Sequence, residues 1–422
     1  MAVENLASNS MANISWLHGL LWWRNWGKRE WAISAIGFAV FVFALAFVSY
    51  SWISDPDSNL SSSFHRITAT DLVDLTLLHN ATRRGAVCLD GSLPGYHYQK
   101  GFGSGANSWV LYIEGGGWCN TIESCFWRRE IHLGSSKHMG HRVHFTGILS
   151  PHQAQNPEFF NWNRVKVQYC DGASLAGHPD KELRNGTRLF FRGQLIWEAL
   201  MDKFFSLGLS KAKQDAPLVD WRLLYIVMNF VVFCLRMKDV IENPTMRYFF
   251  HDVFILHGLR KSLHKDCIAR KEPAECLFPK EIIKNIATPV FLLHSAYDFW
   301  QIQNILIPEG SDLYHYWQKC RLDIHNCNAT QVEILKGYRR SLLKALKEFQ
   351  KNKEGGMFIS SCFIHCQAWM TETWHAPTSP RINNKTIAES VGDWYFNRNA
   401  SKKIDCPFLC NPTCYHVNFT HG

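Results

Sequence analysis

The chain alternates short apolar runs typical of strands with longer stretches in which apolar residues recur every three or four positions, as in helices. The clearest predicted strands are Trp109–Ile113, Val165–Tyr169, Pro289–His294 and Met357–Ser360. Strands that alternate with helices are typical of an α/β fold, in which helices cover both faces of a sheet. The pattern therefore predicts a three-layer α/β sandwich with a largely parallel central sheet.

Two segments have the pattern of amphipathic helices. The first is predicted over Arg192–Leu207 and ends before Gly208, and the second over Gln331–Gln350 with Thr330 as its N-cap. The apolar faces consist of Leu195, Ile196, Leu200 and Phe204 in the first helix and of Val332, Leu335, Tyr338, Leu342, Leu346 and Phe349 in the second. We expect both faces to pack against the core.

A continuous apolar stretch, Trp31–Ile53, is long enough to cross a bilayer with some tilt. Three basic residues precede it and two acidic residues follow it: Arg24, Lys28, Arg29, Asp55 and Asp57. The positive-inside rule then predicts a cytosolic N-terminus and a lumenal remainder. A cleaved signal peptide is the alternative, but the stretch exceeds a usual signal-peptide core, so we favour an uncleaved type II anchor.

The chain divides into four segments by composition. Residues 1–30 form a cytosolic head, 31–53 the signal anchor, 54–70 a polar stem, and 71–422 one large domain in which 215–237 is atypical. Of the 422 residues 46% are apolar, which is enough for a substantial core. The formal charge of +9 suits an acidic polysaccharide, although scattered surface lysines explain it equally well, and nothing indicates a nucleic-acid partner.

The large domain carries marks of the secretory pathway. Seven N-x-S/T motifs follow the apolar stretch, at Asn59, Asn80, Asn185, Asn328, Asn384, Asn399 and Asn418. All fourteen cysteines also lie beyond it, which predicts disulfides in an oxidising compartment without fixing their pairing. Cys406, Cys410, Cys414 and His416 have residue types that bind zinc, but the compartment favours disulfides and no metal site.

Three short motifs follow predicted strands. They are Glu114–Cys119 (E-G-G-G-W-C), Ser295–Gln301 (S-A-Y-D-F-W-Q) and Ser361–Gln367 (S-C-F-I-H-C-Q). Ligands of open α/β sheets bind at the carboxyl ends of the strands, so we expect these motifs to meet. A glycine loop, an acid and a histidine in this chain order are what an α/β-hydrolase needs besides its nucleophile.

These motifs resemble the oxyanion loop, acid loop and histidine loop of the plant pectin acetylesterases, whose animal relative is the carboxylesterase Notum. The resemblance covers Leu72–Cys414 except Asp215–Met237. It implies an α/β-hydrolase-like sandwich and a serine esterase that hydrolyses acetyl esters of cell-wall pectin (homogalacturonan) without a cofactor. Such a protein is secreted to the cell wall or held in the secretory pathway by its anchor.

The resemblance also implies roles for single residues. His365 would be the general base and later the general acid, and Asp298 would hold its tautomer and offset the imidazolium charge. Backbone N–H groups around Gly116, Gly117 and Trp118 would bind the oxyanion. Without the resemblance, each of these motifs would be interpreted as structural.

The nucleophile motif of that family, G-C-S-A-G-G, is missing from Asp215–Met237. Asp215–Phe230 can be encoded so that reading one base earlier gives G-C-S-A-G-G-L-A-T-L-V-H-C-D-E-F. We therefore predict that this window is the nucleophile segment read out of frame, through a splice-site difference or an error in gene structure. The rival is a second membrane segment or new core helix at Leu223–Leu235, which is too short to span a bilayer.

Another serine could in principle replace the missing one. Ser174, in Asp171–Gly177 (D-G-A-S-L-A-G), follows a predicted strand, but the glycine spacing is one residue too long for a nucleophile elbow. We interpret it as part of a pocket-lining loop. If the chain is made as printed, it is expected to be a catalytically inactive carbohydrate-binding protein. A further alternative, by analogy with Notum, is a deacylase of a lipid-modified protein.

Overall fold

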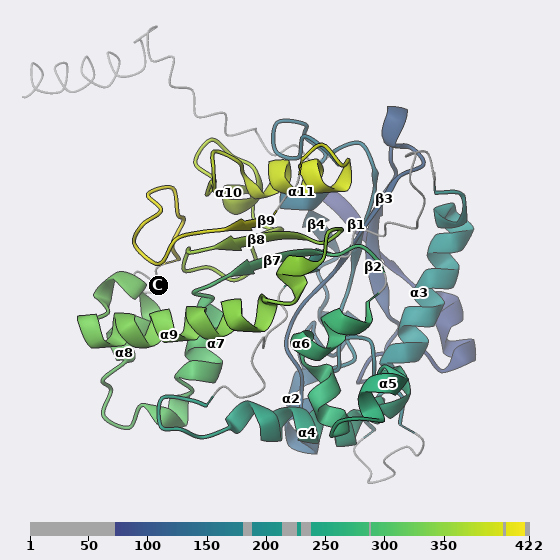
Figure 1. Cartoon of the computed structure of the whole chain (residues 1–422). Helices are drawn as coiled ribbons and strands as arrows, with labels where there is room; N and C mark the ends of the chain where they lie inside the picture. Colours follow the sequence, from purple (N-terminus) through teal and green to yellow (C-terminus); the bar gives the residue numbers. More distant parts are fainter. Residues whose placement is uncertain are drawn as a thin grey trace, which may run out of the picture. The chain divides into compact units, whose positions relative to one another are not determined.

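The computed structural model describes residues 72–179, 188–212, 226–228, 238–286, 288–399 and 402–417, and Figure 1 shows their arrangement. Within these residues no helix is long and apolar enough to cross a membrane. The predicted anchor Trp31–Ile53 lies outside the described residues, as do the head and stem. So does the window Asp215–Met237, apart from a three-residue strand.

The first sheet has five strands in the order β3-β5-β2-β1-β4. They are β1 (Leu72–Leu77), β2 (Gly95–Gln99), β3 (Trp109–Ile113), β4 (Arg142–His144) and β5 (Asn163–Val167). β3 and β5 are parallel, with Trp109 opposite Asn163 and Ile113 opposite Val167. The other pairs in this sheet are antiparallel.

The second sheet is parallel throughout, in the order β6-β7-β8-β9. Its strands are β6 (Ile226–Met228), β7 (Phe291–Ser295), β8 (Gly356–Ser360) and β9 (Lys402–Ile404). β7 pairs with β8 over five residues but with β6 over only three. β3 is one edge strand of the first described sheet, and β6 is one edge strand of the second.

Helices lie beside both sheets (Figure 1). The longest are α3 (Gly193–Leu207), α4 (Thr245–His257), α9 (Ala329–Leu346) and α11 (Ile387–Tyr395). The shorter ones are α2 (Ile122–Arg128), α5 (Lys265–Ile268), α6 (Pro279–Ile282), α7 (Phe299–Gln301), α8 (Gln318–Leu322) and α10 (Thr371–Trp374). In the figure α9 lies on one side of β7 and β8 while α10 and α11 lie on the other, which gives three layers.

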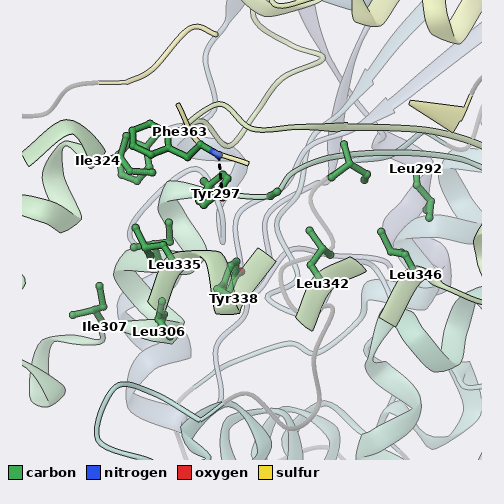
Figure 2. Packing of buried hydrophobic residues seen from close by; sticks show 14 of the residues in the cluster. Leu292, Tyr297, Leu306, Ile307, Ile324, Leu335, Tyr338, Leu342, Leu346 and Phe363 are labelled. Atoms are coloured by element: carbon green, nitrogen blue, oxygen red, sulfur yellow. Dashed lines mark hydrogen bonds between the residues drawn. The ribbon is translucent and has the colours of Figure 1, made fainter. Parts of the chain in front are cut away.

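Each face of β7 and β8 packs against a different helix. On one face Leu292, Met357 and Ile359 join the apolar stripe of α9, and Figure 2 shows Leu335, Tyr338, Leu342 and Leu346 in a row along that helix. On the other face Phe291 and Phe358 pack with α11. Val110 and Tyr112 of β3 belong to that same second cluster, so one apolar layer covers both sheets. Full burial of each such side chain stabilises the fold by about 1.5–3 kcal/mol.

The observed elements confirm the predicted α/β-hydrolase-like sandwich, with shifts of a few residues at the strand ends. Trp109–Ile113 is confirmed as a strand, whereas the strand predicted at Val165–Tyr169 begins and ends two residues earlier. The helix predicted from Arg192 begins at Gly193 and ends at Leu207 as expected. The central sheet, predicted as one, is described as two.

One cap prediction was wrong. The second amphipathic helix begins at Ala329, and its N-cap is Asn328 rather than Thr330. The Asn328 side chain accepts a hydrogen bond from the Gln331 backbone N–H, and the Gln331 side chain accepts one from the Asn328 N–H. This capping box satisfies two N–H groups at the helix start, which Thr330 cannot do from inside the first turn.

Six disulfides between described cysteines confirm the predicted framework and supply the pairing that the sequence left open. They are Cys88–Cys170, Cys119–Cys125, Cys267–Cys276, Cys320–Cys327, Cys362–Cys414 and Cys406–Cys410. Two of them attach directly to the predicted motifs. Cys119–Cys125 ties the glycine loop to α2, and Cys362–Cys414 ties the histidine loop to the C-terminal segment. The tail cysteines considered for zinc are therefore used in disulfides.

Candidate active site

The three motifs leave their strands at carboxyl ends. β7 and β8 are neighbouring parallel strands, and Ser295 is opposite Ser360, so the segments that follow start side by side. Asp298 comes three residues after β7, and His365 comes five residues after β8. The glycine loop begins directly after β3, where the Glu114 N–H donates to the Val167 carbonyl. Parallel strands thus deliver the acid and the base to one place.

Asp298 and His365 form a hydrogen-bonded pair. Asp298 Oδ2 lies 2.7 Å from His365 Nδ1, and the Asp298 side chain is completely buried. Its other oxygen, Oδ1, accepts a hydrogen bond from the Gln301 N–H at 2.9 Å and thereby caps α7. Because an ionised carboxylate only accepts, it selects the tautomer with the proton on Nδ1, which leaves the lone pair of Nε2 available as a base.

A buried polar network lies beneath this pair. His294, on β7, is buried, and burial lowers its pKa to about 4, so that it is neutral near pH 7. Its Nε2 lies 3.1 Å from Gln301 Nε2, and Gln301 Oε1 accepts a hydrogen bond from the Tyr338 hydroxyl of α9. The network links α7 to α9, and it holds the turn that carries Asp298.

Aromatic rings enclose the His365 imidazole. Trp300 stacks on it with ring centroids 5.8 Å apart and planes 21° apart, and Phe299 meets it edge-on at 5.9 Å. Trp300 also reaches the glycine loop, because a Cβ built on Gly117 would lie 3.9 Å from its ring. Trp300 therefore bridges the acid–base pair and the loop expected to bind the oxyanion.

The glycine loop needs its glycines. Gly117 has φ +67°, a left-handed conformation that costs little without a side chain. A Cβ on Gly116 would approach Leu133 Cδ2 to 2.6 Å, closer than carbon atoms pack. Trp118 packs on Phe250 of α4, with centroids 4.9 Å apart. At Gly117 the loop therefore presents backbone next to Trp300.

The base of the loop is fixed by charge. Glu114 Oε1 lies 2.7 Å from Lys166 Nζ in a largely buried ion pair. Lys166 also lies over the Trp369 ring, 4.7 Å from its centroid. The pair holds the end of β3 against β5 and fixes the point at which the glycine loop begins.

Comparison with known proteins assigns this chain to a family. The profile of the pectinacetylesterase family matches residues 67–216 and 231–415. The chain belongs to that family. Pectin acetylesterase 5 of Arabidopsis thaliana is 51% identical over 420 residues, which cover 95% of this chain and 98% of the relative. Pectin acetylesterase 4 of the same plant is 50% identical over 417 residues, 94% of this chain and all of the relative.

A solved structure has the same fold. The Wnt deacylase Notum from Drosophila superposes with a TM-score of 0.61 and 20% sequence identity. The superposition covers 81% of this chain and 99% of the Notum chain. At this identity the likeness concerns the fold alone. It agrees with the α/β-hydrolase-like sandwich described above.

The match to the pectinacetylesterase profile is interrupted in the window where the family's nucleophile motif is missing. Residues 217–230 fall between the two matched stretches, inside the window Asp215–Met237. The out-of-frame origin of this window stays a prediction. The alternative nucleophile Ser174 is exposed, has φ +54°, and donates its backbone N–H to the Tyr169 hydroxyl at 3.2 Å. Among the described residues no hydrogen bond joins Ser174 to His365.

The roles of several other residues near the candidate site could not be recognised from the sequence. The hydrogen bonds of Tyr169 and Arg128 to the glycine loop connect residues 52 and 12 positions apart. His294 lies on strand β7, at a position that the sequence pattern assigns to the core. Trp300 was visible in the motif, but its stacking on His365 depends on the fold. The order of the three motifs along the chain, and their place after strands, could be recognised from the sequence.

Proposed function

We propose that this fold serves the hydrolysis of acetyl esters of cell-wall pectin by a Ser-His-Asp mechanism. The observation that carries the proposal is the 2.7 Å contact between Asp298 and His365 beside a glycine loop, in a chain of the pectinacetylesterase family. The serine belongs to the shifted reading of Asp215–Met237. We call the protein in which that reading and its flanks are restored the restored-frame chain.

The mechanism follows from the groups present. His365 Nε2 takes the proton of the serine hydroxyl as the serine oxygen bonds to the acetyl carbonyl carbon. The carbonyl oxygen becomes an oxyanion and accepts hydrogen bonds from backbone N–H groups of the Gly116–Trp118 loop. His365 then protonates the departing sugar oxygen. Water, deprotonated by His365, then bonds to the acetyl carbonyl carbon, and His365 returns the proton to the serine oxygen as acetate leaves. Asp298 stabilises the imidazolium in both halves.

The printed chain has a different function under this proposal. It keeps the described acid–base pair and the glycine loop but has no serine at the family position. It therefore binds carbohydrate without cleaving it. Deacylation of a lipid-modified protein is a rival for the restored-frame chain, and the Notum likeness supports it only at the level of the fold.

The test compares substrates. The restored-frame chain is expected to release acetate from acetylated pectin and to leave a palmitoleoylated peptide intact. Pectin that has been deacetylated with alkali serves as the blank. Cleavage of the peptide without release of acetate from pectin would replace this proposal with the deacylase.

The proposed location is the secretory pathway, with Trp31–Ile53 as a type II anchor. The basic residues before that stretch and the sequons after it support this orientation. We expect endoglycosidase to increase the gel mobility of the protein, and an epitope at Met1 to be digested by protease added to intact microsomes. Protection of the epitope would reverse the assigned orientation.

A further inference from the structure

Within the described part of the chain, two backbone donors in the glycine loop make no hydrogen bond. They are the N–H groups of Gly117 and Trp118. The carbonyls of the same two peptide units are both engaged. The Gly116 carbonyl accepts from Arg128 Nη2 at 2.6 Å, and the Gly117 carbonyl accepts from the Tyr169 hydroxyl at 2.6 Å.

Peptide geometry connects these two facts. In a planar trans peptide the C=O of one residue and the N–H of the next point in opposite directions. The hydrogen bond from Arg128 to the Gly116 carbonyl therefore sets the direction of the Gly117 N–H. The hydrogen bond from Tyr169 to the Gly117 carbonyl likewise sets the direction of the Trp118 N–H.

We propose that Tyr169 and Arg128 are positioning residues that hold the Gly117 and Trp118 N–H groups in the orientation that binds the oxyanion. This inference rests on the proposed function. Glycine peptides rotate easily, and Gly117 has a left-handed φ. Neither Gly116 nor Gly117 has a side chain that could fix the two peptides. Two side chains from outside the loop supply that constraint.

The Tyr169 hydroxyl is itself held in place. It carries one proton, which it gives to the Gly117 carbonyl, and it accepts the Ser174 N–H at 3.2 Å. The ring lies two residues after β5 and is almost completely buried, so it cannot swing away. The Ser174 loop thus gains a role that needs no nucleophilic serine: its backbone orients the hydroxyl that orients the oxyanion loop.

Arg128 is anchored as firmly. It ends α2, whose start is fixed by a capping box between Thr121 and Ser124 and by the Cys119–Cys125 disulfide. Its guanidinium lies over the Tyr169 ring, 5.7 Å from the centroid. A cationic donor on a carbonyl also polarises the peptide, and this strengthens donation from the N–H on the other side. Arg128 and Tyr169 therefore act on the same donors from neighbouring positions.

The kinetic test uses the restored-frame chain. Tyr169→Phe keeps the ring but removes the hydroxyl, and we expect kcat for acetate release to fall about tenfold to a hundredfold, somewhat less than the loss of a whole oxyanion donor. KM should stay within about twofold, because the oxyanion exists only in the transition state. Arg128→Met should also lower kcat, and Arg128→Lys, which can still donate to Gly116, should recover part of it.

Matched controls separate positioning from general damage. Tyr98→Phe also removes a tyrosine hydroxyl that donates a hydrogen bond, to Asn163 Oδ1 at 2.9 Å on the same sheet. Arg340→Met removes an arginine that pairs with Glu333 on α9. Both should leave kcat unchanged. A folded Tyr169→Phe protein with unchanged kcat, or one whose KM rises while kcat is kept, would overturn the inference.

A structural test does not depend on activity. Crystal structures of the printed chain and its Tyr169→Phe variant should differ in the Gly117–Trp118 peptide, whose carbonyl should rotate when the hydroxyl is lost. An unrotated peptide would refute the positioning role even if pectin is the substrate. A rotated peptide in a protein whose restored-frame form releases no acetate would keep the positioning role and refute the proposed function.

Discussion

The printed chain is expected to release no measurable acetate from acetylated pectin, while the restored-frame chain releases it catalytically. The described site retains the Asp298–His365 pair, but Asp215–Met237 supplies no serine hydroxyl from which His365 could take a proton under the proposed mechanism. Removing the nucleophile of a comparable triad lowers kcat by about a millionfold. Acetate is measured for both proteins at equal concentration, with deacetylated pectin as the blank.

The result that would contradict this expectation involves Ser174. Robust acetate release by the printed chain, abolished by Ser174→Ala, would make Ser174 the nucleophile. The described geometry gives that serine an exposed position, a left-handed backbone and a backbone hydrogen bond to Tyr169. Retained activity in the Ser174→Ala variant of the restored-frame chain would support its role as loop backbone.

Substitution of the acid–base pair is expected to have the next largest effect. In the restored-frame chain, His365→Ala should lower kcat by about a millionfold, because no other group takes the serine proton. Asp298→Asn should lower kcat by about ten-thousandfold. The asparagine oxygen can still accept from the Gln301 N–H, but its NH₂ group would face Nδ1 and force the proton to Nε2.

The chain provides a matched control for this pair. Asp323 also caps a helical turn and lies 2.9 Å from a histidine ring nitrogen, Nδ1 of His325. Asp323→Asn therefore makes the same chemical change at a pair for which no contact with Asp298 or His365 is seen in the described residues, and it should leave kcat unchanged. Equal losses in Asp298→Asn and Asp323→Asn would indicate a general loss of folding, and an active His365→Ala protein would contradict the mechanism.

Local patterns in the sequence were sufficient for much of the fold. The apolar run Trp109–Ile113 is a strand, and the stripe from Leu335 to Leu346 faces β7 and β8, because periodic burial leaves a direct mark on the sequence. Element ends were less certain. Thr330 and Asn328 are both good N-cap residues, and only the reciprocal bond with Gln331 distinguishes them.

Contacts between distant residues could not be predicted in this way. The long-range disulfides Cys88–Cys170 and Cys362–Cys414, the stack of Trp300 on His365 and the hydrogen bond from Tyr169 to Gly117 all depend on how the strands are ordered. The sequence placed Asp298, His365 and the glycine loop at strand ends, and this was enough to expect them together. It gave no reason to expect Tyr169, which follows β5, and Arg128 of α2 to orient the loop.

The division between the two described sheets coincides with the atypical window. β3 ends one sheet, β6 begins the other, and β6 is three residues long inside the window. In an α/β-hydrolase the nucleophile follows a strand of the central sheet. It can reach His365 only if that strand lies in this part of the sheet. The family segment is therefore expected to provide the strand that continues the sheet from β7 toward β3.

The most direct test of the central claim is the transcript sequence across the codons for Gln214–Lys238. The account predicts that transcripts contain, in frame, the codons for G-C-S-A-G-G at this place, followed by a return to the printed sequence near Lys238. Several independent full-length transcripts that all encode Asp215–Met237 as printed would contradict it.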